Sequence, residues 1–177
     1  MMSDFIQNVP WFLPGVAIWT VFAIIVFKPL AGFLGTRRVI ALLLTMSVGL
    51  ILFATLTPVT PDLDAGIAPR GQCDLSRVTI ASWSTLTTYR APSLNIVLFV
   101  PLGFALGLLP RTSRNVAIVL GAFLLTVLVE ATQSLVSELG RGCESADIVD
   151  NTMGLAIGLA AGLVVTVVAQ RSRGPNA

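Results

Sequence analysis

The sequence predicts an all-α protein, folded as a polytopic bundle of about five transmembrane helices. Of its 177 residues, 55% are hydrophobic and only 11% are charged, with a mean hydropathy of +0.88. Soluble domains carry about 25% charged residues. Several apolar stretches approach the ~20 residues that a helix needs to cross ~30 Å of hydrocarbon. No soluble domain boundary or repeat separates them, so residues 1–177 are expected to form one membrane domain.

Five apolar stretches are the predicted spans. The first is interpreted as a retained span, because the preceding MMSDFIQNVP has no basic region and no small-residue cleavage site follows. The third is short and contains Pro101, which removes a hydrogen bond to the carbonyl of Val97 and should bend the helix. That bend is either a packing kink or a source of free carbonyls. The spans are 11–27, 39–56, 95–109, 116–136 and 153–169.

Positive charge predicts the orientation, since cationic residues favour cytoplasmic loops. The loops on one side carry seven cations and those on the other side carry four, three of which lie in the long loop 57–94. The count places the N-terminus and loop 57–94 outside the cell and the tail 170–177 in the cytoplasm. The seven are Lys28, Arg37, Arg38, Arg111, Arg114, Arg171 and Arg173; the four are Arg70, Arg77, Arg90 and Arg141.

The loop 57–94 opens with many turn residues and continues with a more apolar half. Leu75, Val78, Trp83 and Leu86 have a spacing that suits a helix lying on the outer membrane surface, although an irregular or strand-like segment fits as well. Both cysteines fall on the predicted outer side, Cys73 in this loop and Cys143 in loop 137–150. An oxidising compartment favours a disulfide between them over two unpaired thiols.

Small residues recur every four positions in two of the spans, and Pro101 lies beside one of these stripes. Such stripes allow close approach of helix backbones in lipid. Packing within the chain is the favoured interpretation, and homodimerisation through the last span is the alternative. The stripes are Gly103 and Gly107 in the third span, and Gly154, Gly158 and Gly162 in the fifth.

Polar side chains gather at the outer ends of three spans. An ionisable residue costs about 2.5–3.5 kcal/mol at the membrane centre, so such residues are expected to find partners. We expect a buried Glu130–Arg141 pair, braced by neighbouring polar groups. Asp147 as N-cap of the last helix and Asp150 at its third position would explain those two by capping alone. The predicted cluster comprises Asn95, Glu130, Gln133, Arg141, Asp147, Asp150 and Asn151.

Four segments of the chain, in order, resemble the VanZ-like family of bacterial membrane proteins over roughly residues 45–165. They are FATLTPVTP, NIVLFVPLGFALG, VEATQSL and GRGCESADIVDNTMGLAIG. The most specific matches are an E-x-x-Q pair, an arginine followed by D-x-x-x-N-x-x-G, and an asparagine before an apolar-Pro-Leu-Gly segment. These matches are Glu130, Gln133, Arg141, Asp147, Asn151, Gly154, Asn95, Pro101 and Gly103.

The resemblance implies a multi-pass protein of the bacterial cell membrane with a role in the cell envelope. The founding member of the family is associated with low-level resistance to teicoplanin, a glycopeptide with a lipid tail. The two cysteines lie outside the family pattern, so the disulfide would be a feature of this chain. The resemblance supplies no reaction.

Several chemistries are excluded or disfavoured. The chain has no histidine, which excludes Ser-His-Asp triads and His-ligated zinc, and its one lysine, Lys28, lies on the inner side. No phosphate-binding loop is present, and no cofactor, metal or nucleic acid is indicated. An enzyme is therefore disfavoured, although Glu130 as acid or base beside Mg²⁺ on Asp147 and Asp150 stays an alternative.

The favoured function is binding of an amphiphile at the outer-leaflet cluster. The ligand would be a membrane lipid, a lipid-linked envelope precursor or a lipid-tailed antibiotic, with its polar head at Arg141 and the carboxylates. A role as accessory subunit of a larger membrane complex, docked through the glycine stripes, is the other alternative.

Overall fold

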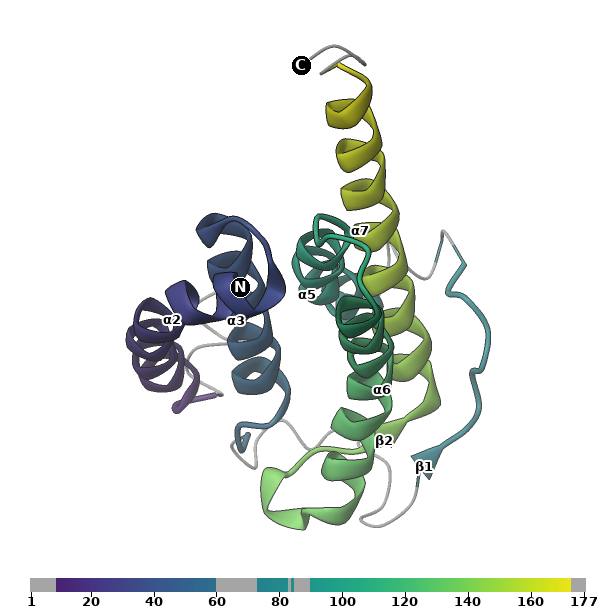
Figure 1. The fold of residues 1–177 in the computed structure, drawn as a ribbon. Coiled ribbons are helices and arrows are strands. Elements are labelled where there is room, and N and C mark those ends of the chain that lie inside the picture. Colours follow the sequence, from purple (N-terminus) through teal and green to yellow (C-terminus); the bar gives the residue numbers. More distant parts are fainter. Residues whose placement is uncertain (1–8, 60–72, 83, 85–89, 173–177) are drawn as a thin grey trace.

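The computed structural model describes residues 9–59, 73–82, 84 and 90–172. Within this part, five long helices carry the fold, which confirms the predicted all-α membrane helix bundle (Figure 1). Two short strands and one 3-10 turn complete it. The helices are α2 (Phe12–Leu34), α3 (Arg38–Thr55), α5 (Arg90–Gly107), α6 (Ser113–Leu135) and α7 (Ser145–Arg171); the rest are β1 (Cys73–Asp74), η2 (Ser137–Leu139) and β2 (Cys143–Glu144).

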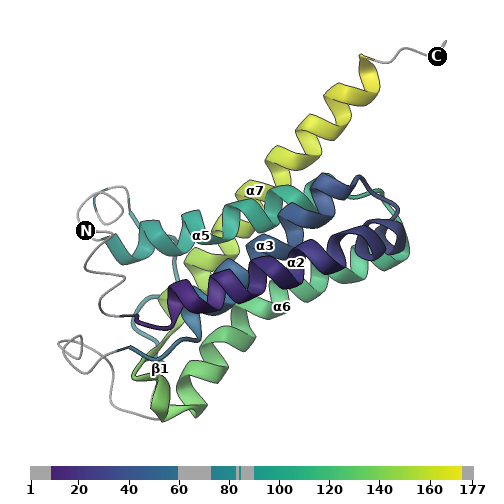
Figure 2. The same cartoon turned by 90° about the vertical axis from the view of Figure 1, so that its left-hand side faces the viewer.

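Four of these helices, α2, α3, α6 and α7, are long and apolar enough to cross a membrane. The apolar part of α5, Ser93–Gly107, is shorter, in line with the short third span expected from the sequence. Successive helices alternate in direction, so α3 and α6 end where α5 and α7 begin (Figure 2). We call this side of the bundle the polar end, because Glu130, Gln133, Arg141, Asp147 and Asn151 lie there.

The last helix begins earlier than its apolar run. It starts at Ser145, where residues 145–152 are too polar to be recognised by hydropathy but still form two helical turns. Glu144 is therefore the N-cap residue, and Asp147 lies in the first turn, where a carboxylate suits the helix dipole. The expectation that Asp147 is the N-cap was wrong, because the helix begins about one turn earlier. Asp150 accordingly lies in the second turn and not at the predicted third position.

Glycines bring α5 and α7 into backbone contact. A methyl group on Gly107 would fall 2.8 Å from the backbone nitrogen of Leu163, and one on Gly158 would fall 2.8 Å from that of Phe104. Gly103, Gly154 and Gly162 face the partner helix in the same way. The two stripes thus pack against each other within one chain. Packing within the chain is the arrangement that the structure shows, with α5 covering the glycine face of α7, and homodimerisation stays a prediction.

Helix α2 packs against α3 through aromatic rings that lie over glycines. The indole of Trp19 lies over Gly49, and the ring of Phe53 lies over Gly15, so each helix inserts an aromatic ring above a glycine of the other. The indole N–H of Trp19 donates to the carbonyl of Thr45 at 2.7 Å. The main apolar core lies around Phe99, between α3, α5, α6 and α7, and Leu34 at the end of α2 also contributes to it.

The segment 73–82 is fastened to the beginning of α7. Cys73 and Cys143 form the expected disulfide, with their Cα atoms 4.5 Å apart, and β1 pairs with β2 in parallel at the same residues. Residues 75–82 are not helical, so the irregular alternative holds for this half, and Leu75 and Val78 are exposed. Trp83 and Leu86 of the predicted surface helix lie outside the described residues, as do residues 173–177 of the tail.

Candidate functional site

Two side chains of α6 enter the polar end from its last turns. Glu130 and Gln133 are three residues apart and therefore share one face of the helix, and both are buried. The carboxylate of Glu130 accepts a hydrogen bond from the backbone N–H of Glu144 at 3.1 Å. The amide of Gln133 donates to the carbonyl of Thr55 at 2.8 Å. These contacts join α6 to the end of α3 and to the chain entering α7.

Arg141 reaches the carboxyl end of α3 from the loop before α7. Its Nη2 donates to the carbonyl of Ala54 at 2.9 Å and its Nε to that of Thr57 at 3.3 Å. The last carbonyls of a helix lack intrahelical partners and carry partial negative charge, so a guanidinium stabilises them. Burial lowers the pKa of Arg141, and the nearby carboxylates of Asp147 and Glu130 act in the opposite direction.

The predicted direct pair between Glu130 and Arg141 is not formed. Within the described residues the only ion pair closer than 4.0 Å joins Arg77 to Asp150. Arg141 donates to carbonyls at the end of α3, and Glu130 accepts from a backbone N–H. Both side chains are therefore hydrogen-bonded to backbone groups and not to each other.

Arg77 is a residue of the site that sequence reasoning missed. Its Nη1 donates to one oxygen of Asp150 at 3.1 Å and its Nη2 donates to the other. This bond, and to a lesser degree the charge of Asp150, raises the pKa of the Arg77 guanidinium against the effect of burial. The signal lay in Cys73: a disulfide to Cys143 brings the cation four residues further on to the start of α7.

The remaining cluster members lie at the first turns of α5 and α7. The side chain of Asn95 lies close to the Asp147 carboxylate. Asn151 is buried one turn further along α7, and its amide oxygen has no hydrogen-bond partner. The amide oxygen of Gln133 is also buried without a partner. The structure thus brings all seven predicted residues to one end of the bundle, from α5, α6, α7 and the loop before α7.

This arrangement limits the chemistry of the cluster. Both oxygens of Asp150 are engaged by Arg77 and its side chain is fully buried, so the Asp147–Asp150 pair is not free to hold Mg²⁺. Arg141, Asp147 and Asn95 are only partly buried. They offer a cation, a carboxylate and an amide at the same end of the bundle, a set that suits a zwitterionic or phosphate-bearing group.

At the opposite end of the bundle, polar side chains also form hydrogen bonds with helix-end carbonyls. Asn115 is buried and donates to the carbonyls of Leu34 and Pro110, at 3.2 and 2.8 Å. Arg114 donates to the carbonyl of Phe33. These two side chains thus cap the carboxyl end of α2, in the same way as Gln133 and Arg141 cap the carboxyl end of α3. Part of the polar cluster is therefore ordinary helix capping. The groups left for a ligand are Asp147, Asn95 and the N–H groups of Arg141 that do not bond to the carbonyls of Ala54 and Thr57.

Comparison with known proteins gives one match. The model of the family VanZ/LLP1 matches residues 40–166, which is most of the chain and includes all seven predicted cluster residues. No curated protein and no solved structure matches this chain. The matched range begins within α3 and ends within α7, so the first helix lies outside it. The chain belongs to the VanZ/LLP1 family of membrane proteins.

Proposed function

We propose that this membrane protein binds the polar head of a lipid-linked or lipid-tailed ligand at its polar end. The excess of cations in the loops of the opposite side orients the polar end toward the outer leaflet. Arg141 would contact a phosphate or carboxylate of the ligand, while Asp147 and Asn95 would contact its amino or hydroxyl groups. Teicoplanin, which has a lipid tail, is one candidate ligand, and tolerance to it would follow from sequestration in the membrane.

The observation that carries this proposal is that Arg141 has no carboxylate partner among the described residues and has N–H groups left for a further acceptor. The side chain is partly buried at the end of a membrane helix, yet no carboxylate within the described part of the chain lies within 4.0 Å of it. Two of its five N–H groups bond to the carbonyls of Ala54 and Thr57. A partly buried arginine that keeps N–H groups for a further acceptor is well placed to bind an anionic head.

Replacing Arg141 by alanine is expected to weaken ligand binding about tenfold or more, since a hydrogen bond to a charged group contributes about 1.5–3 kcal/mol. The measurement is binding of teicoplanin and of a polyprenyl phosphate to the protein in lipid nanodiscs. Arg141→Lys should retain part of the affinity, because it keeps the charge but loses the planar arrangement of donors.

The control for this experiment is Arg111→Ala, which removes an exposed arginine from the opposite end and should leave binding unchanged. Because Arg141 also caps α3, the unfolding midpoint of each variant is measured beside its affinity. An Arg141→Ala protein that folds and binds both compounds as the wild type does would contradict the proposal.

A further inference from the structure

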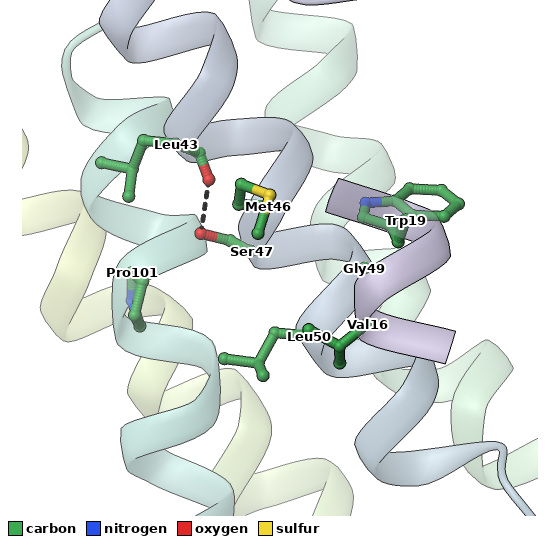
Figure 3. A pocket seen from close by; sticks show the side chains of 8 residues that line it. All are labelled: Val16, Trp19, Leu43, Met46, Ser47, Gly49, Leu50 and Pro101. Carbon is green, nitrogen blue, oxygen red and sulfur yellow. Dashed lines mark hydrogen bonds between the residues drawn. The ribbon is translucent and has the colours of Figure 1, made fainter. Parts of the chain in front are cut away.

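A cavity of about 180 Å³ lies between α2, α3 and α5, away from the polar cluster (Figure 3). Its lining is apolar, and it is partly open. A cavity of about 150 Å³ lined by apolar side chains can hold a benzene molecule, so this one has room for a run of roughly six carbon atoms. Its lining includes Val16, Trp19, Leu43, Ser47, Leu50 and Pro101.

The polar groups in the lining already have partners. The hydroxyl of Ser47 donates to the carbonyl of Leu43 at 2.7 Å, and the indole N–H of Trp19 donates to that of Thr45 at 2.7 Å. Pro101 has no N–H at all. A water molecule needs at least two polar partners to be held in a cavity. The cavity therefore favours a hydrocarbon occupant, which would restore the dispersion contacts that its walls lack.

The cavity and the arginine site share one face of α3. Leu43, Ser47 and Leu50 line the cavity, and Ala54 and Thr57 supply the carbonyls that bind Arg141. Leu43, Ser47, Leu50 and Ala54 are spaced by four, three and four residues, which is the spacing of a single helical stripe, and Thr57 follows just beyond the end of α3. Four residues separate Leu50 from Ala54, which corresponds to about 6 Å along the helix axis. A molecule with its head at Arg141 would thus have its first chain carbons beside the cavity.

We propose that this cavity is the site for a hydrocarbon chain of the ligand whose head binds at Arg141. The inference rests on the proposed function for the identity of the head group. The chain would enter from the membrane between α2 and α5, pass Leu50 and end against Trp19. Specificity for lipid-tailed molecules then comes from two contacts on one helix face, a charged one at its end and an apolar one in its middle.

The test uses photolabelling of the full chain in nanodiscs by a phospholipid that carries a diazirine midway along one acyl chain. In the wild type, peptides containing Leu43 and Leu50 should be labelled above those containing the lipid-facing Leu120 and Leu124 of α6. Ser47→Leu and Leu50→Trp should each reduce labelling in the cavity about tenfold, because excluding two or more methylene groups costs that much in affinity. Leu120→Trp is the matched control and should change nothing there.

The outcomes separate this inference from the proposed function. Cavity labelling that stays at the wild-type level in both Ser47→Leu and Leu50→Trp, or that never exceeds labelling at Leu120, would overturn the chain site even if Arg141→Ala abolishes head binding. Cavity labelling that falls in both variants supports the chain site. If Arg141→Ala leaves head binding intact in that case, the chain site stands and the head site fails.

Discussion

Replacing Gly158 by alanine is expected to disrupt the α5–α7 pair and to destabilise the protein by about 3 kcal/mol or more. A Cβ atom at this position would lie 2.8 Å from the backbone nitrogen of Phe104, and closer still to the carbonyl oxygen of Val100. Backbone atoms of a helix cannot rotate away as a side chain can. The two helices would have to separate along their whole contact, and the contacts of Gly103, Gly107, Gly154 and Gly162 would be lost with them.

The measurement is the folded fraction as a function of the SDS mole fraction in mixed micelles. Gly121→Ala is the matched control, because nothing lies within 4 Å of a methyl group at that position of α6. It should leave stability unchanged or raise it by up to about 1 kcal/mol, since alanine favours a helix more than glycine does. Equal stability of the Gly158→Ala and Gly121→Ala proteins would show that α5 and α7 do not meet at these glycines.

The apolar helices and their close packing could be predicted from the sequence because both leave a periodic pattern. Hydropathy located the five long helices of the described residues, and the four-residue spacing of Gly154, Gly158 and Gly162 marked the face of α7 that contacts α5. The same criterion failed at the start of α7, since residues 145–152 are polar and yet helical. Hydropathy reports where lipid lies, and a helix can begin before it reaches lipid.

The members of the polar cluster were predictable, but most of their partners were not. Glu130, Gln133 and Arg141 stand out because polar residues are rare in such a sequence. Their partners are backbone groups of Thr55, Ala54, Thr57 and Glu144, which every residue possesses and which no motif can mark. The Arg77–Asp150 pair was missed for another reason, since 73 residues separate the two and the disulfide was the one sign in the sequence that they lie close together.

Loss of Arg77 is the second change with a large expected effect. Asp150 is fully buried, and both its oxygens are bound by the Arg77 guanidinium. Breaking a buried pair by removal of one partner costs about 3–5 kcal/mol, because the other charge is left buried and alone. The Arg77 side chain retains 24% exposure, so the lower end, about 3 kcal/mol, is expected for Arg77→Ala. The same SDS titration measures it, with exposed Arg111→Ala as the control.

A double-mutant cycle distinguishes this pair from general damage to the segment 73–82. Asp150→Asn removes the buried charge, so Arg77→Ala should cost less in that background than in the wild type, by about 1–3 kcal/mol. Ser145 also fastens the segment, through hydrogen bonds from its hydroxyl to the carbonyls of Asp74 and Arg77 at 3.1 and 2.9 Å. Ser145→Ala removes those bonds without touching the charges and should show no coupling to Asp150→Asn. Additive effects of Arg77→Ala and Asp150→Asn would mean that Arg77 stabilises the protein through its packing and its hydrogen bonds to the carbonyls of Thr79 and Ala146, and not through the charge of Asp150.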